Sequence, residues 1–253
     1  MAAGQIAGER SVIEIGPLSK KQEFEEAVAL QKKIWGFADI ELLPVRLFNV
    51  ATKIGGQVFG AFDGDRMIGF CLAIPGIKPG PKSYLHSHML GVLPEYHNHG
   101  VGRTMKLAQR EDALKKKISL IEWTFDPLEL KNAYFNIEKL GAIVRRFVFN
   151  QYGTTSSFLH GSLPTDRCTA EWWIDSDRVQ AALDGRPSNR PAVEATIEVP
   201  AAISQLRHSD PKQALEIQKT VGERFQKLFD MGLAVTGFER SEEKGSYILG
   251  FWK

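Results

Sequence analysis

The sequence has few cysteines, no long apolar run and almost no net charge. Cys71 and Cys168 are the two cysteines among 253 residues, and they lie far apart, so we expect no disulfide framework. A count of 32 Lys and Arg against 30 Asp and Glu gives a formal net charge of +2. Since both signs are interspersed, the composition favours neither a nucleic-acid nor a membrane partner. No apolar stretch approaches the ~20 residues that a membrane-spanning helix needs.

What is present is the composition of an ordinary globular protein, with 43% apolar and 25% charged residues. A chain of this length can bury one good core and carry an additional lobe. Residues 1–10 lack the basic and then apolar pattern of a signal peptide, and we expect them to form a disordered leader. Because free thiols also fit a reducing compartment, we expect a cytoplasmic protein.

Hydrophobic periodicity and turn residues divide the chain into strands and helices. The main domain is expected over residues 11–175, and residues 176–253 form an extension of unassigned role. The predicted strands are Val12–Ile15, Gln57–Phe62, Met67–Ile74, Leu85–Leu93, Ser119–Phe125, Ile143–Asn150, Thr169–Ile174, Ala192–Val199, Leu233–Glu239 and Ser246–Trp252. The predicted helices follow Ser19, span Pro44–Lys53, and run from the glycines at 100–102 to about Lys117, from Asp126 to Gly141 and from Asp210 to Gly232.

One stretch, residues 86–104, joins a strand to a helix through a loop with two glycines. Its first part is apolar apart from two alternating histidines, which indicates a largely buried strand, and Pro94 ends it. Gly100 and Gly102 stand where the helical periodicity begins. Backbone without side chains can approach a ligand closely, and the first N–H groups of a helix lack intrahelical partners. The stretch therefore predicts a phosphate-binding site.

This stretch resembles the pyrophosphate loop of the GNAT acyltransferase superfamily, Arg/Gln-x-x-Gly-x-Gly/Ala after a strand that ends in an apolar-x-Val pattern. Here Leu90-Gly91-Val92 ends the strand, and His97, Gly100 and Gly102 occupy the signature positions, with His97 in place of Arg or Gln. The lysine of a Walker loop and the third glycine of a Rossmann fingerprint are both missing. A purely structural turn is the remaining alternative.

The resemblance implies a GNAT-type α/β (α+β) fold over roughly residues 12–175, a mixed and mostly antiparallel sheet flanked by helices, here with a C-terminal helix-plus-hairpin extension. A second stretch, residues 133–142, is similar to the family motif Ala-x-x-x-Tyr-x-x-x-Gly-Phe. The implied co-substrate is acetyl-CoA or another acyl-CoA. By the family pattern, the backbone at Leu90, Gly91 and Val92 would bind the thioester oxygen. The main chain at His97, Asn98, His99, Gly100, Val101, Gly102, Arg103 and Thr104 would hold the pyrophosphate, and side chains near Asn132 and Asn136 would reach the pantetheine arm.

His86 and His88 are the candidate bases, because residues two apart on a strand face the same side. Alkylammonium groups titrate near pH ~10, and an imidazole is suited to take their proton at neutral pH. The layout is similar to that of arylalkylamine N-acetyltransferases, where paired histidines serve this step. Glu122 on the next strand is the competing base. The alternative for each is a polar side chain that only satisfies hydrogen bonds within the sheet.

The general acid is where the sequence departs from the family. The tyrosine that protonates the departing thiolate would stand four residues before Gly141, and Ile137 stands there instead. Tyr134, one turn earlier, is a candidate substitute, with core packing as the alternative. A thiolate with a pKa near ~8.5 can also take its proton from solvent.

The acceptor site is the least determined part. His160 and Arg167, in the region before the last strand of the main domain, are candidate substrate-binding residues. Arg145 and Arg146 on the preceding strand are further candidates to bind a carboxylate of the acceptor or of a dicarboxylic acyl group. Surface ion pairs are the alternative for these side chains.

The histidines at 86, 88, 97 and 99 form two His-x-His pairs, yet no cysteine lies near them and the phosphate loop competes for two of them. We expect no metal.

Taken together, these patterns predict an acyl-CoA-dependent N-acyltransferase that transfers its acyl group, acetyl in the first instance, directly to a primary amine of a small molecule or amino acid. One alternative uses succinyl-CoA or another acyl donor. A second is a non-catalytic CoA-binding or interaction module. We expect neither a nucleic-acid nor a membrane partner, and a homodimer is one arrangement that the sequence leaves open.

Overall fold

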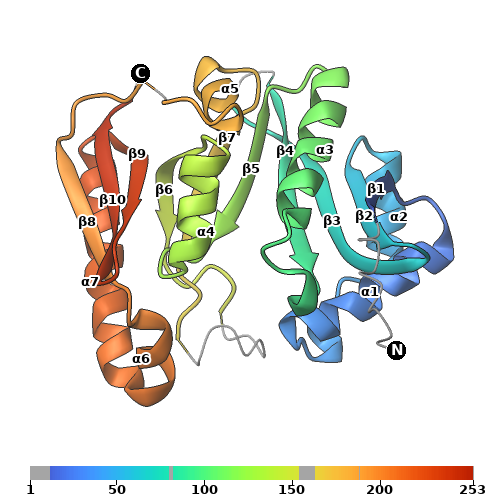
Figure 1. Ribbon diagram of the computed structural model, residues 1–253, viewed down its shortest axis with the longest axis horizontal. Coiled ribbons are helices and arrows are strands. Elements are labelled where there is room, and N and C mark those ends of the chain that lie inside the picture. Colours follow the sequence, from blue (N-terminus) through green and yellow to red (C-terminus); the bar gives the residue numbers. More distant parts are fainter. Residues whose placement is uncertain (1–11, 80–81, 154–162, 188, 253) are drawn as a thin grey trace, which may run out of the picture.

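The computed structural model describes residues 12–79, 82–153, 163–187 and 189–252, so the predicted leader over residues 1–10 lies outside the described residues. Within the described ranges ten strands form one sheet, in the order β1-β2-β3-β4-β5-β7-β6-β9-β10-β8 (Figure 1). Its strand pairs are antiparallel except β4 with β5, which run parallel. The predicted fold class, a mostly antiparallel sheet flanked by helices, is confirmed.

The elements have the following bounds. The strands are β1 (Ile13–Pro17), β2 (Gln57–Asp63), β3 (Arg66–Ile77), β4 (Ser83–Val92), β5 (Leu120–Phe125), β6 (Ile143–Val148), β7 (Arg167–Trp173), β8 (Ala195–Pro200), β9 (Leu233–Arg240) and β10 (Lys244–Phe251). The α-helices are α1 (Lys21–Trp35), α2 (Val45–Lys53), α3 (Val101–Lys115), α4 (Leu130–Tyr134), α5 (Asp177–Leu183), α6 (Ile203–Ser209) and α7 (Pro211–Asp230). A π-helical turn, Phe135–Lys139, continues α4.

Helices α1 and α3 lie on opposite faces of the sheet at β4. A Cβ on Gly91 would lie 2.5 Å from the Trp35 ring of α1, which explains why glycine stands there. The neighbouring Leu90 instead reaches α3, where its Cδ2 lies 3.7 Å from the Cβ position of Gly102. Successive strand residues face opposite sides, so β4 is covered by one helix on each side.

Helix α4 shares the face of α3. Trp123 of β5 lies under the ammonium of Lys106 from α3, and its indole Nε1 donates to Oδ1 of Asn136, which continues α4. Figure 1 shows both helices in front of the sheet. On the other face of the sheet, β4 is covered by α1. The strand residues next to Leu90 and Trp123 in sequence point to that face.

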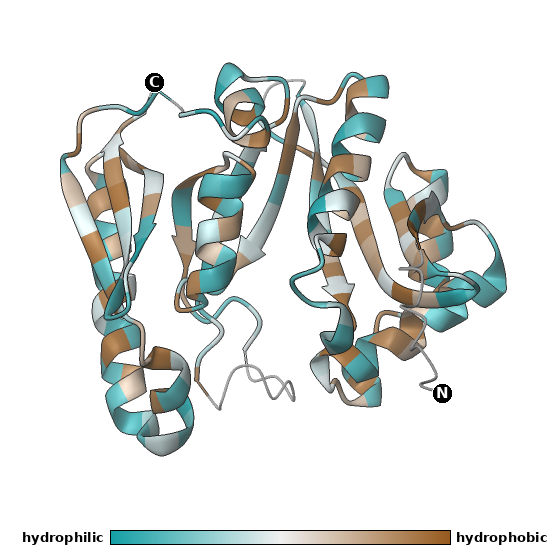
Figure 2. Cartoon of the chain, in the orientation of Figure 1, coloured by the Kyte–Doolittle hydropathy of each residue, from teal (hydrophilic) through white to brown (hydrophobic). Residues whose placement is uncertain are grey.

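The sheet opens at its centre. Strands β4 and β5 are paired only at Leu85 with Ile121 and at His86 with Glu122, and they separate beyond these residues (Figure 1). Each half has its own apolar core, and Figure 2 shows helices banded with hydrophobic and hydrophilic residues on either side of the opening. The largest fully buried rings are Phe48 and Phe70 in the N-terminal half and Trp172, Phe225, Phe238 and Tyr247 in the C-terminal half.

The C-terminal residues continue this sheet. Strand β9 pairs with β6 through Val144 and Val235, and β10 and β8 follow it outward. Helix α7 packs against β6, β8 and β9. The predicted helix and hairpin are present, but the sequence did not predict α5 and α6 or the pairing of the hairpin with the main sheet.

Two helices differ from what their local sequence patterns favour. The buried face of α3 includes Lys106 and Gln109, whereas the apolar Leu114 is 38% exposed. Asp126 does not cap α4, whose N-cap is Glu129. The Asp126 carboxylate instead accepts from the backbone N–H of Leu128 and pairs with the buried Arg207. A long-range ion pair thus replaces the local cap.

Candidate active site

The paired histidines lie on β4 at the opening. His86 and His88 have ring centroids 5.8 Å apart, as predicted for side chains on one side of a strand. The β3–β4 register shifts between Leu72, which pairs with Met89, and Ala73, which pairs with Ser87, so His88 is the extra residue of a β-bulge. A bulge bends a strand and re-aims a side chain. The bulge therefore turns β4 at the place where it leaves β5.

Both imidazoles are neutral at physiological pH. Burial is the largest cause that lowers the pKa of His86 to about 4; the nearby His88, Lys106 and Arg146 contribute to this lowering, and Glu122 opposes it. Burial also lowers the pKa of His88. A neutral imidazole has a free nitrogen lone pair, so either side chain can accept a proton.

This burial predicts an unusual pH dependence. An ordinary histidine base gives an acidic limb of kcat/KM near pH ~6.5. We expect a limb displaced below that value, because burial lowers the pKa of both imidazoles, that of His86 to about 4. Between those values the unfolded chain binds more protons than the folded one, so the free energy of unfolding falls as the pH drops. Rate and chemical-denaturation profiles from pH 4 to 8 measure both effects; an acidic limb at pH 6.5 or above would contradict this assignment.

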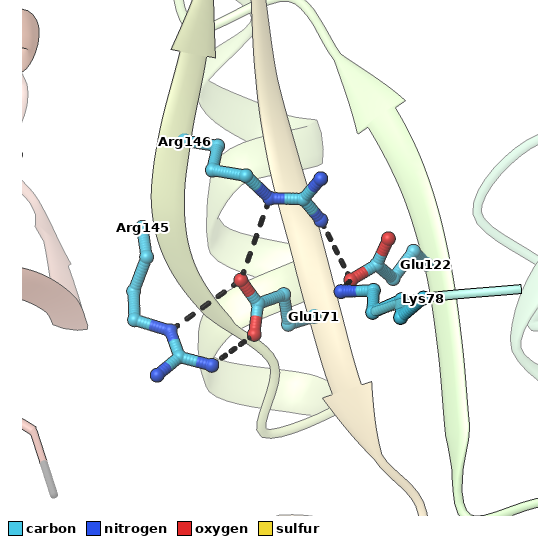
Figure 3. A network of polar contacts seen from close by, with 5 residues as sticks. All are labelled: Lys78, Glu122, Arg145, Arg146 and Glu171. Carbon is cyan, nitrogen blue, oxygen red and sulfur yellow. Dashed lines mark hydrogen bonds and ion pairs between the residues drawn. The ribbon is translucent and has the colours of Figure 1, made fainter. Parts of the chain in front are cut away.

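Glu122, the competing base, lies within a network of ion pairs (Figure 3) and pairs in register with His86 across β4 and β5. Its side chain is 3% exposed, pairs with Lys78 and lies 2.6 Å from Nη2 of Arg146. Glu171 on β7 is equally buried, pairs with Arg145 at 2.5 Å and lies 3.7 Å from Nε of Arg146. Lys78 and Arg146 thus hold the Glu122 carboxylate in two ion pairs, so the side chain already has a structural role in the network.

The predicted phosphate loop is an exposed turn that leads into α3. Asn98 and Gly100 have positive φ values of 64° and 80°, a left-handed conformation that Asn tolerates and Gly adopts freely. Gly100 is the N-cap of α3, and no side chain within the described residues caps this helix. A Cβ at Gly100 would meet nothing within 4 Å, so the space beside the N-cap residue of α3 is open. The geometry fits an anion bound by backbone amides.

Two side chains of this loop have other partners. The His97 ring nitrogen Nε2 lies 2.9 Å from the backbone oxygen of Val92 and donates to it, which fixes the loop against the end of β4. Arg103 donates from Nη2 to the backbone oxygen of Leu183 at 2.9 Å. These two side chains therefore brace the surrounding structure, and the main chain of the loop is the part that fits an anion.

Lys106 is a residue at the opening that the sequence analysis missed. It is 4% exposed, its ammonium lies 3.7 Å from the centroid of the Trp123 ring, and it donates to Ser87 Oγ at 2.9 Å. Burial lowers its pKa to about 7. Lys106 thus joins β4 to β5 on the α3 face, opposite the histidines. A lysine within a helical pattern normally indicates a solvated face, so no sequence signal separates it from the surface lysines.

The residues of the second motif and its neighbours differ in how deeply they are buried. Ile137 is 1% exposed, so the position of the missing tyrosine is filled by core packing. Tyr134 is half-buried against the core of the C-terminal half, on the face opposite the histidines, and the Lys139 ammonium lies 5.4 Å from its ring centroid. Asn132 is exposed, whereas Asn136 is buried and accepts from Trp123, so its side chain carbonyl is already engaged.

Of the two predicted acceptor residues, His160 lies outside the described residues. Arg167 begins β7, and its guanidinium carbon lies 5.4 Å from the centroid of the Tyr152 ring. The Tyr152 hydroxyl in turn lies 2.9 Å from Oγ1 of Thr124 on β5. Arg167 and Glu171 are four residues apart on one strand and therefore face the same side of the sheet.

Three other kinds of feature concern the rest of the described chain: a surface pocket, a metal site and a membrane-spanning helix. A surface pocket of about 400 Å³ is lined by Phe149 and by Glu223, Gln226, Lys227 and Asp230 of α7. No described residues form a group of three or more His, Cys, Asp or Glu side chains placed to hold a metal ion. Among the described helices, none has both the length and the apolar character needed to cross a membrane.

Comparisons with known proteins bear on the family and the fold. Residues 24–141 match the profile of the Acetyltransferase (GNAT) family, a span that contains β4, the predicted phosphate loop and α4. No curated protein shows a significant match to the sequence.

Solved structures share the fold at low sequence identity. A GNAT-family acetyltransferase described as putative, from Desulfovibrio desulfuricans, is 13% identical with a TM-score of 0.50, over 64% of this chain and 99% of its own. The ribosomal-protein-S18-alanine N-acetyltransferase of Escherichia coli is 14% identical with a TM-score of 0.52, over 65% and 96%. An aminoglycoside 6'-acetyltransferase type Ii is 17% identical with a TM-score of 0.50, over 64% and 98%.

Proposed function

Since residues 24–141 of this chain form an acetyltransferase domain of the GNAT family, we propose that the protein transfers an acyl group from an acyl-CoA directly to a primary amine of a small molecule or amino acid. The observation that carries the proposal is the open, uncapped start of α3 beside the separation of β4 from β5. The paired neutral histidines at the same opening supply a base for the amine.

The donor would be held mainly by backbone. The N–H groups of the first turn of α3 and of the loop before it, from His97 to Thr104, would bind the diphosphate. Because β4 leaves β5 after His86, the backbone N–H groups near Leu90 and Val92 have no β5 partner and would be available to the thioester oxygen. The thioester supplies an acyl carbon that is already activated toward an amine.

The amine arrives as an ammonium and must lose a proton before it can attack. His88 at the bulge, with His86 5.8 Å away, would accept that proton directly or through a water molecule. Nitrogen then forms its bond to the acyl carbon as the carbon–sulfur bond breaks, and the nitrogen gives up its second proton to solvent to become the neutral amide. Solvent would protonate the thiolate, because Ile137 is buried and Tyr134 packs against the core on the other face.

The test is a thiol-release assay with acetyl-CoA and a panel of amines and amino acids, on the wild type and on the His88→Ala and Glu122→Gln variants. We expect release that depends on both substrates and slows strongly in His88→Ala. A smaller change is expected in Glu122→Gln, because the carboxylate serves an ion-pair network. If CoA stabilises the protein against heat while no acceptor yields free thiol, the protein is a CoA-binding module, and the proposed function is wrong.

A further inference from the structure

We infer that Arg145 and Arg146 form a subsite for a carboxylate carried by one of the two substrates, most directly the acceptor. The inference rests on the proposed function, because it places the anion beside the histidines that would deprotonate the amine. Its starting point is the network in Figure 3, where two buried carboxylates meet three cations at the edge of the opening.

The network has one positive charge in excess. Glu122 and Glu171 are each 3% exposed, and Lys78, Arg145 and Arg146 are 31%, 40% and 48% exposed. The negative charges are thus covered while the cations reach solvent. An anion that approaches this face meets guanidinium groups first.

The Arg146 guanidinium has N–H donors that are not used within the network. Its Nη2 binds Glu122 at 2.6 Å and its Nε lies 3.7 Å from Glu171, and no described residue accepts from its Nη1. A guanidinium carries five N–H donors in a planar fork that matches a carboxylate. The two buried glutamates hold the fork in place, so little side-chain freedom is lost when a ligand binds.

The position links this anion site to the reacting groups. Arg146 is close enough to His86 for its charge to lower the pKa of that imidazole, and Glu122 pairs in register with His86 across the strands. In an α-amino acid one carbon separates the carboxylate from the amine. A carboxylate on Arg146 would therefore leave the amine beside the paired histidines.

Arg146→Gln tests the subsite without breaking the network, because Glu122 keeps Lys78 and Glu171 keeps Arg145. The first arm compares amino acids with their decarboxylated amines, such as phenylalanine with phenethylamine, at fixed acetyl-CoA. The second compares succinyl-CoA with acetyl-CoA at a fixed acceptor. The matched control is Arg186→Gln, which removes an exposed ion pair with Asp184.

In one of the two arms we expect the wild type to prefer the carboxylate-bearing compound by about 10- to 100-fold in kcat/KM, and Arg146→Gln to abolish that preference. The Arg186→Gln control keeps it. A merely structural role would slow both members of a pair alike and leave their ratio unchanged. The inference is overturned if neither arm shows a preference, or if the preference survives in both Arg145→Gln and Arg146→Gln.

Calorimetric titration of the same pairs separates this inference from the proposed function. If the chain transfers no acyl group but binds the carboxylate-bearing member more tightly in an Arg146-dependent manner, the subsite stands and the enzyme assignment falls. If transfer to amines occurs with equal affinity for both members of every pair, the enzyme assignment stands and the subsite falls.

Discussion

The His86→Ala/His88→Ala double variant is expected to lose about 10²- to 10⁴-fold in kcat while its affinity for CoA stays unchanged. General base catalysis by a positioned side chain contributes a factor of this size. The two rings lie on the face opposite α3, whereas the amides expected to hold the diphosphate lie at the start of that helix. Steady-state kinetics together with calorimetric titration of CoA measure the two quantities separately.

The matched control is His208→Ala, since His208 is exposed on α6, far along the chain from the opening. It is expected to keep wild-type rates. If the two histidines act as one relay, the losses in the single variants do not multiply to the loss in the double variant. A double variant with less than a 10-fold loss would show that another group, Glu122 first among them, takes the proton.

Gly102→Asp is expected to weaken CoA binding by about 100-fold or more. The carboxylate would stand in the first turn of α3, and two unit charges 4 Å apart at an effective dielectric constant of 20 repel by about 4 kcal/mol. The same carboxylate interacts favourably with the positive end of the helix dipole, so the unliganded protein keeps its stability. Weak binding in a chain of normal melting temperature is thus the expected combination.

Gly102→Ala is the control for size. A Cβ at this position meets Leu90 Cδ2 at 3.7 Å, an ordinary van der Waals contact, and the φ angle is not of the left-handed kind. CoA affinity within a few-fold of the wild type is expected. Equal affinity in Gly102→Asp and Gly102→Ala would show that no phosphate group lies near the start of α3.

The sequence predicted the parts of the fold that local signals specify. Alternation and turn residues placed the hairpin β2–β3 and the central strand β4, and the change of periodicity after Gly100 placed α3. Periodicity gives the face of a strand but not its partner. The pairing of β9 with β6 therefore could not be predicted.

The site shows the same division. The spacing of His86 and His88 predicted rings on one side, and the rings are 5.8 Å apart. The buried Lys106, with its partners Ser87 and Trp123, depends on residues brought together by the fold, and so does the Glu171 that anchors Arg145. The sequence offered Arg145 and Arg146 as either ion pairs or carboxylate readers. Both arginines do form ion pairs. The excess of one positive charge becomes apparent only when the fold brings the three cations together with the two glutamates.

The most direct measurement is calorimetric titration of the wild-type protein with CoA and with pantetheine, which keeps the thiol arm but lacks the nucleotide diphosphate. If backbone amides at the start of α3 hold the diphosphate, CoA binds saturably and pantetheine binds at least ~100-fold more weakly, because several charge-assisted hydrogen bonds are lost. Absence of CoA binding, or equal affinity for the two compounds, would contradict the account.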